Sequence, residues 1–261
     1  MTARTVRIVW QVTENDQNIY ASEFSVAPTG ALNLTLSPAA AINLVGTTHT
    51  VTATVTDSLS SPVANMSVLF TVTGSVNISG SCTTGANGQC TFTYQGPQLP
   101  GNDLIDAFAD QNGNGVWDGG FCTHLPCLQE ARSQATKTWV LPSSTSGSAF
   151  GGGRLNLPGP PYLFSFNAMS NGGTASGTCH VRVLFRPFEI TCTDVNVFVR
   201  NGNEATFYGD ALQNGAPTTY VIHVVGNSNP GTGVPDSFFI ETAAGESASG
   251  TLAAGNIVVT P

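Results

Sequence analysis

The sequence predicts an all-β protein with two β-sandwich-type domains in series. Three observations carry this prediction. Apolar and polar residues alternate with the period of two that is typical of half-buried strands, and helical spacing is nearly absent. Charged residues make up only 9% of the 261 residues, against roughly 25% in ordinary soluble domains. Glycine and proline, with 29 and 15 copies, are frequent enough to separate many short strands by turns.

The N-terminal segment, residues 1–29, contains one strong strand pattern over residues 5–12. A polar stretch, residues 13–22, separates it from the next strand. The pattern predicts either an extra edge strand on the protein's own sandwich or a strand donated to a neighbouring subunit, which would build head-to-tail filaments. The donated side chains would be Val6, Ile8, Trp10 and Val12.

Residues 30–141 contain seven strand patterns over about 110 residues, which predicts an immunoglobulin-like sandwich of two facing sheets. The clearest is His49–Asp57, in which Val51, Ala53 and Val55 occupy one face and threonines the other. The remaining strands are expected at 32–37, 66–73, 79–84, 89–95, 103–110 and 134–141.

Between the last two of these strands, residues 110–118 alternate oxygen-bearing side chains with glycines, as a calcium loop requires. The first, third and fifth side chains would converge on the ion, the seventh residue would offer its carbonyl, and the ninth would bind directly or through water. The expected ligands are Asp110, Asn112, Asn114, the carbonyl of Val116 and Asp118, with Glu130 or Asp106 completing the set.

This loop departs from the EF-hand pattern. Phe121 stands where an EF-hand places a bidentate glutamate, and flanking helices are not predicted. Two formal negative charges make a weakly charged site, so the expected calcium affinity is on the order of 10⁻⁴ to 10⁻³ M, the range of extracellular modules. The alternative is a polar Gly/Asn turn that binds no ion.

Six cysteines form three local pairs along the chain. The pairs are Cys82–Cys90, Cys122–Cys127 and Cys179–Cys192. Turn residues lie between the members of the first and third pairs, so hairpins would set their sulfurs opposite each other, while the second pair would staple the segment after the loop. Zinc sites use closer cysteine or histidine spacings than these. Three disulfides, and hence an extracellular or cell-surface location, are predicted.

Several motifs lie at fixed places in residues 30–141. They are Val45–Thr47, His49–Asp57, Ser61–Val63, Val68–Phe70, Asn87–Tyr94, Pro100–Gly101 with Asp103, and Ala135–Trp139. Together they resemble the bacterial Ig-like domains of the invasin/intimin type, often called Big-1. Members of that family are repeated stalk or adhesin modules of secreted and surface proteins, so the resemblance implies a structural or adhesive role. Phe121–Leu128 is an insertion relative to that family.

Residues 142–149 are small and polar and predict a flexible linker before a second domain, residues 150–261. Its strands are expected at 153–157, 162–169, 177–185, 189–194, 195–200, 204–211, 218–225, 237–242 and 250–259. Its motifs are Gly151–Gly153, Phe164–Phe166, Ala205–Gly209, Asn229–Gly231, Asp236–Ile240 and Gly250–Ile257. They resemble the small bacterial β-domain named post-COAP-1, which implies no established biochemical activity.

Composition and missing motifs exclude several functions. The net charge of −8 and only eight Lys and Arg residues argue against nucleic acid as a partner. The longest apolar runs are too short to span a bilayer, so membrane insertion is not expected. His49, His124, His180 and His223 have no spacing that suggests a shared metal or a catalytic triad, and GxSxG, HExxH and phosphate-loop motifs are lacking. The chain is therefore predicted to be non-enzymatic.

Three Asn-X-Ser/Thr triplets are candidates for glycosylation. They begin at Asn33, Asn65 and Asn77. Such triplets also arise by chance in Ser/Thr-rich sequences.

The expected function is that of a non-enzymatic extracellular structural or adhesive module, stiffened by calcium and disulfides. Its partners would be other protein subunits or surface ligands. Two alternatives stay open. One is a filament subunit that forms a homopolymer by strand donation, and the other is a carbohydrate-binding accessory module of a secreted hydrolase, which exposed aromatic rows on one sheet face would favour.

Overall fold

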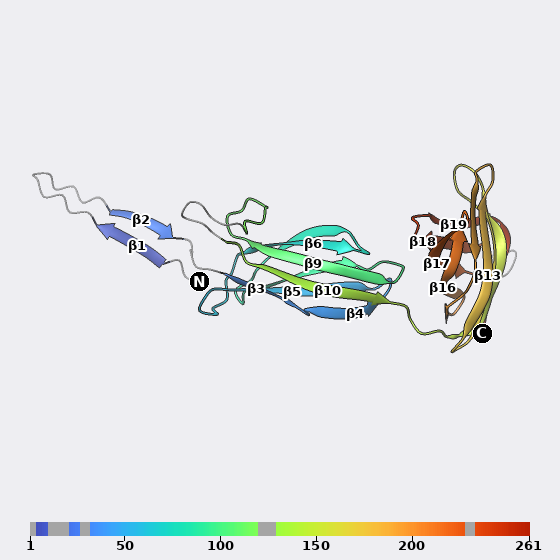
Figure 1. Cartoon of the computed structure of the whole chain (residues 1–261), viewed down its shortest axis with the longest axis horizontal. Helices are drawn as coiled ribbons and strands as arrows, with labels where there is room; N and C mark the ends of the chain where they lie inside the picture. The colour runs from blue at the N-terminus through green and yellow to red at the C-terminus, as the bar shows by residue number, and fades with distance from the viewer. Residues whose placement is uncertain (1–3, 10–20, 27–31, 120–128, 228–232) are drawn as a thin grey trace, which may run out of the picture. The chain divides into compact units, whose positions relative to one another are not determined.

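The computed structural model describes residues 4–9, 21–26, 32–119, 129–227 and 233–261, and its regular elements in these ranges are all strands (Figure 1). The predicted all-β class is confirmed. No helix long and apolar enough to cross a bilayer occurs in these ranges. Contacts divide the chain into two compact units: Met1–Ile42, Thr48–Gln95 and Asn102–Thr138 form the first, and Asn43–Thr47, Gly96–Gly101 and Trp139–Pro261 form the second.

The N-terminal segment forms a hairpin. Strands β1 (Arg4–Val9) and β2 (Ala21–Val26) make an antiparallel two-stranded sheet, in which Val6 lies opposite Phe24 and Ile8 opposite Ser22. Strand β1 thus pairs within its own chain, in a sheet separate from the sandwich. Strand β2 is not predicted, because its first residues, Ala21 and Ser22, lie at the end of the polar stretch 13–22. Trp10 and Val12 lie outside the described residues.

The immunoglobulin-like sandwich has two sheets. One has the strand order β4-β10-β9-β6-β7 and the other β3-β5-β8. The strands are β3 (Asn33–Ser37), β4 (Ala40–Leu44), β5 (Thr48–Thr56), β6 (Ser67–Gly74), β7 (Ile78–Thr83), β8 (Gln89–Gln95), β9 (Gly101–Asp110) and β10 (Arg132–Val140). Strand β4 is not predicted. It is a short edge strand on which the apolar Ile42 and Leu44 are 72% and 46% exposed, so buried apolar residues do not mark it in the sequence.

Alternating side chains of both sheets fill the core of the sandwich. On β5, Val51, Ala53 and Val55 are fully buried, as predicted, while the intervening threonines face outward. On β9 of the other sheet, Ile105 and Ala107 are also fully buried. This alternation is the pattern that two facing sheets produce.

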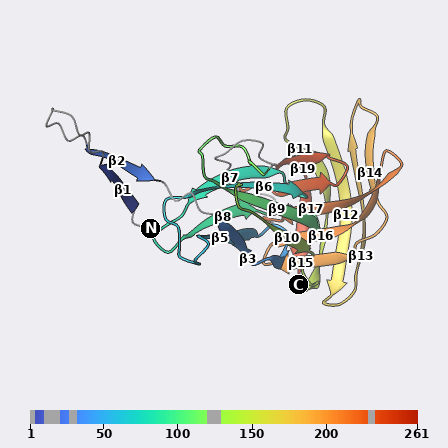
Figure 2. The ribbon, with the colours of Figure 1, turned by 60° about the vertical axis from the view of Figure 1, so that its left-hand side comes forward.

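Strands β11–β19 form a single antiparallel sheet (Figure 2). They are β11 (Ser146–Leu155), β12 (Tyr162–Asn171), β13 (Ala175–Val183), β14 (Phe188–Cys192), β15 (Val197–Asn201), β16 (Glu204–Gln213), β17 (Ala216–Val225), β18 (Ser237–Thr242) and β19 (Ser247–Thr260). Strand β11 begins within the stretch 142–149 that is predicted as a linker. Its buried Ala149 and its pairing with both β12 and β19 make these residues part of the sheet.

This sheet closes on itself. Strand β14 pairs with β13 on one side and with residues 211–213 of β16 on the other, and β11 pairs with β19. Eight strands therefore form a ring, with β15 along the remaining part of the β16 edge. The result is a barrel rather than two separate sheets. Because sandwiches and barrels share the same period-two alternation, the sequence pattern does not distinguish them.

Aromatic side chains pack the interior of the barrel. The rings of Phe164 and Phe238 stack with centroids 4.0 Å apart, and Phe166 and Phe207 lie 5.3 Å apart. Tyr220 meets Phe207 edge-on and is fully buried. An eight-stranded barrel encloses a space that side chains can fill, so this interior is a packed core.

Candidate functional site

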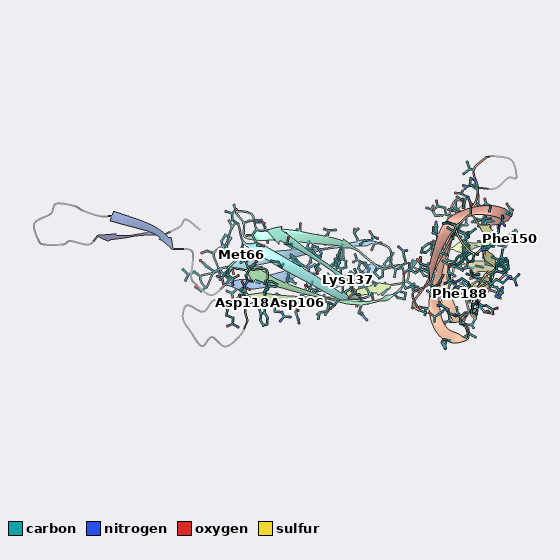
Figure 3. The ribbon with its side chains drawn as sticks, turned by 90° about the horizontal axis from the view of Figure 1, so that it is seen from above. Met66, Asp106, Asp118, Lys137, Phe150 and Phe188 are labelled. Carbon is teal, nitrogen blue, oxygen red and sulfur yellow. A yellow bond between two sulfur atoms is a disulfide. The ribbon has the colours of Figure 1, made fainter. Side chains whose placement is uncertain are left out.

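The candidate cation loop joins β9 to β10, as predicted. Asp110 is the last residue of β9, and Glu130 lies two residues before β10. Figure 3 labels Asp118 in this loop and Asp106 on β9 at the same end of the sandwich. Residues 120–128 lie outside the described part of the chain.

The carboxylate of Asp110 organises the first half of the loop. Its Oδ1 accepts a hydrogen bond from the Gly113 N–H at 2.7 Å, and its Oδ2 accepts one from the Gly115 N–H at 3.0 Å. Both glycines have positive φ, 74° and 73°, a conformation that other residues adopt at a cost. The glycines therefore permit the turns that wrap this segment around Asp110.

Asn112 and Asn114 converge on Asp118. Both side-chain amides donate to Asp118 Oδ2, at 2.8 Å for Asn114. Their Oδ1 atoms accept backbone N–H groups two residues ahead, including that of Val116 at 2.7 Å. Three of the predicted ligand side chains thus meet at one point.

Glu130 holds the two ends of the loop together. Its side chain accepts hydrogen bonds from the Gln111 N–H at 2.8 Å and from the Asp118 N–H at 3.0 Å. It is only 2% exposed, and its backbone N–H donates to the Asp118 carbonyl at 3.1 Å. Its carboxylate is therefore bound to loop backbone at both oxygens.

Asp106, the other candidate for completing the site, is bound to residues of β10 instead. It forms an ion pair with Arg132 and accepts a hydrogen bond from Gln134 at 3.2 Å. The Arg132 guanidinium lowers the pKa of the Asp106 carboxyl below its ordinary value. Arg132 also lies 4.4 Å from the ring centre of Trp117 in the loop. Of the two candidates, the structure brings Glu130 to the loop.

A cation at this loop would be held mainly by oxygen atoms of neutral groups. Within the described residues, three or more His, Cys, Asp or Glu side chains do not gather as a metal cluster, so most ligands would be amide and carbonyl oxygens. The N–H₂ groups of Asn112 and Asn114 face Asp118. Calcium binding would require both amides to present oxygen to the same point, and that rotation would turn their N–H₂ groups toward the Asn114 and Val116 N–H groups that the amide oxygens now accept.

Two of the predicted disulfides are present. Cys179 and Cys192 lie on the adjacent strands β13 and β14, with Cα atoms 4.8 Å apart, as the hairpin prediction requires. Cys82 and Cys90 are also bonded, with Cα atoms 5.8 Å apart.

The setting of the Cys82–Cys90 pair differs from the prediction. Its strands, β7 and β8, belong to different sheets, so this disulfide ties the two sheets of the sandwich together. The chain between them crosses from one sheet to the other instead of turning back along the same one. Cys122 and Cys127 lie outside the described residues.

The other sequence-based candidates are at the surface. Asn33, Asn65 and Asn77 are all exposed, and their glycosylation stays a prediction. The exposed aromatic side chains of the described residues include Trp117, Phe150 and Phe185. They come from a loop, a strand and a turn, so they do not supply the aromatic row on one sheet face that carbohydrate binding would favour.

One group of residues is not predicted from the sequence, namely polar side chains at core positions of the sandwich. Lys137 is fully buried on β10, and His49 and Asp103 are 5% and 3% exposed. The sequence signal that could identify Lys137 as buried is its place in the alternation of its strand. Lys137 lies between Ala135 and Trp139 in the alternation of its strand, on the side that faces the core.

Comparison with known proteins bears on the sandwich. Residues 31–100 match the family model of the bacterial Ig-like domain (group 1). This supports the predicted Ig-like resemblance for strands β3–β8 and suggests a bacterial surface or structural module; the matched family is a non-enzymatic one. The match includes neither the loop 110–118 nor the barrel, whose resemblance to post-COAP-1 stays a prediction. No curated protein matches the chain.

Proposed function

We propose that the protein is a non-enzymatic structural or adhesive module of an extracellular or cell-surface protein. The observation that carries this proposal is the two-sheet sandwich whose residues 31–100 match bacterial Ig-like domains. The disulfides Cys82–Cys90 and Cys179–Cys192 agree with an oxidising location. Its mechanism is mechanical. The domains present a stable surface to other subunits or surface ligands.

Calcium is the second part of the proposal. Asp110 ends β9, and Asp118 is bound to Glu130, just before β10, through backbone groups. An ion held between Asp110, Asn112, Asn114 and Asp118 would therefore connect the ends of two neighbouring strands. Binding to the folded state alone stabilises it by mass action.

Thermal unfolding in calcium and in chelator tests this part. With a Kd of roughly 10⁻³ M, free calcium at about ten times Kd stabilises the fold by about 1.4 kcal/mol. The same ionic strength supplied as sodium chloride is the control for screening. The variant Asp118→Asn removes one of the two loop charges, and we expect it to lose most of the calcium-dependent shift. Equal melting temperatures in calcium and chelator would defeat the calcium proposal.

A filament subunit is the second candidate function, and the N-terminal hairpin favours it. Strands β1 and β2 form a sheet of only two strands in the described chain. Such isolated hairpins are marginally stable in water, so pairing with a sheet edge of another subunit would stabilise them. Electron microscopy of the purified protein, compared with a variant lacking residues 1–29, tests this. Filaments that persist without the segment would exclude strand donation.

A further inference from the structure

A cluster of four polar side chains lies in the sandwich core. It consists of His49 on β5, Tyr94 on β8, Asp103 on β9 and Lys137 on β10, so both sheets contribute. Their exposed fractions are 5%, 3%, 3% and 0%. Figure 3 labels Lys137 along the sandwich, farther from the cation loop than Asp106. The cluster is thus separate from the loop, and its burial has to be explained because isolated buried charges are costly.

The pairing of β9 with β10 places Asp103 opposite Lys137. Three contacts between the strands agree on one antiparallel register: the Ala109 N–H to the Ala131 carbonyl at 2.9 Å, Gln134 to Asp106 at 3.2 Å, and Thr138 to Asn102 at 2.9 Å. The same register sets Asp103 directly across from Lys137. Directly opposed residues have Cβ atoms about 4.5–5.5 Å apart, which is well within the reach of a lysine side chain.

Hydrogen bonds hold the Asp103 carboxyl group at both oxygens. Oδ1 accepts the Val76 N–H at 2.8 Å, and Oδ2 accepts the Tyr94 hydroxyl at 3.1 Å. The His49 ring meets the Tyr94 ring edge-on, with centroids 5.8 Å apart. Donors on both oxygens draw electron density from the carboxyl carbon, so Asp103 is oriented and polarised for attack by a nucleophile.

The Lys137 amine is placed to be that nucleophile. Its Nζ donates to the Thr138 carbonyl at 3.0 Å, and the side chain has no exposed surface. Burial lowers the pKa of Lys137, although the charge of Asp103 opposes this shift. A desolvated lysine has a larger neutral fraction, and the neutral amine is the nucleophilic form.

We propose that Lys137 and Asp103 form a modification site at which the two side chains condense into an intramolecular amide bond. A proton first passes from the Lys137 ammonium to the Asp103 carboxylate, directly or through the Tyr94 hydroxyl. The neutral Nζ attacks the carboxyl carbon, a C–N bond forms and one C–O bond breaks. The departing oxygen leaves as water, with one hydrogen from the carboxyl group and one from Nζ. The step needs no oxidant, metal or cofactor.

The surroundings favour condensation over a lasting ion pair. A buried ammonium and carboxylate both pay a desolvation cost that their attraction only partly offsets. The amide product is neutral, and the released water can leave the core. The bond would join β9 to β10 covalently, and it depends neither on calcium nor on the proposed adhesive role.

Intact-mass spectrometry of the reduced, denatured protein tests the proposal. We expect the wild-type chain to be lighter than its sequence mass by one water molecule, and the variants Lys137→Met and Asp103→Ala to have their full masses. Trypsin should fail to cleave after Lys137, and tandem spectra should show a branched peptide that joins the two residues. Tyr94→Phe should form the bond more slowly.

Two outcomes would overturn the inference. A wild-type chain of full mass would show that Lys137 and Asp103 remain an ion pair. A loss of water that persists in Lys137→Met would place the dehydration elsewhere, for example in a cyclised aspartate before a glycine such as Asp118. Because the wild-type mass alone decides the first point, a variant that folds poorly does not weaken the test.

Discussion

The sandwich and the barrel consist of similar antiparallel strands, but their sheets are held together differently. In the described part of the sandwich, sheets of five and three strands face each other without strand pairing between them, and the Cys82–Cys90 bridge crosses from one to the other. In the barrel, backbone hydrogen bonds run around the whole ring, and Cys179–Cys192 joins strands that are already paired. Covalent links therefore add more to the architecture of the sandwich than to that of the barrel.

The cores of the two domains also differ, in the polarity of their side chains. The barrel interior is mainly apolar and aromatic, whereas the sandwich core contains His49, Asp103 and Lys137. Buried polar groups stabilise a core only when their partners are correctly placed. We therefore expect the sandwich to be the domain that responds to pH and to chemical modification.

Core truncation gives the largest expected effects. Phe70 of the sandwich is 1% exposed, and Phe207 of the barrel is fully buried. Replacing either by alanine should destabilise its own domain by about 3–5 kcal/mol, because each leaves a cavity. Calorimetry with Phe185→Ala as control, a residue that is 94% exposed, measures this. If each variant shifted one common transition, the proposed division into separate domains would be wrong.

Removal of a disulfide should destabilise the protein less than core truncation does. With sequence separations of 8 and 13 residues, the chain-entropy relation gives about 2.5–3 kcal/mol for each. The two disulfides should differ in how easily a reductant reaches them, because Cys82 and Cys90 are partly exposed while Cys179 and Cys192 are buried. Mild reductant followed by thiol labelling should therefore open Cys82–Cys90 first. Equal labelling of both pairs would contradict the comparison.

Acidification should weaken the sandwich through His49. Burial lowers the pKa of His49 below its ordinary value of 6.5, a cause that does not depend on the charge of Lys137. A histidine whose folded pKa is lowered contributes stability that is fully present above the unfolded pKa of about 6.5 and is lost as pH falls through the folded value. Denaturant titrations from pH 8 to 5 should show this slope, and His49→Gln should flatten it. An unchanged slope in the variant would assign the effect to another group.

The smallest expected effect is at the surface of the sandwich. Arg132→Gln removes the ion pair with Asp106, and exposed pairs contribute about 0–1 kcal/mol. The lowered pKa of Asp106 means that the contribution is present above about pH 3.8 and is lost as pH falls through the folded value. Urea unfolding at pH 7 and at pH 2 measures the difference. Arg154→Gln, at an exposed site of the barrel, is the matched control and should be neutral.

Much of the local structure could be predicted from the sequence. The strand Gln89–Gln95 and the strand Ser237–Thr242 have the predicted bounds, because alternation reports the direction of each side chain. The convergence of Asn112 and Asn114 on Asp118 is also local and follows from the glycine spacing.

Long-range pairing could not be predicted in the same way. The bonding of β14 to β16 closes the ring, and the placement of β7 and β8 in different sheets makes Cys82–Cys90 a bridge between sheets. Period-two alternation is compatible with either arrangement. The burial of Lys137 could not be predicted for another reason. Lysine is usually exposed, so its residue type argues against the core position that the alternation of β10 gives it.

The adjacency of β11 and β19 has a consequence for protein engineering. Ser148 pairs with Thr260, so the barrel starts and finishes at neighbouring positions of one sheet. A short linker could join those two points, and new termini could open in the exposed β13–β14 turn at Phe185 without breaking any pair in the ring. The barrel is thus suited to circular permutation and to insertion as a cassette into a surface loop of a host protein.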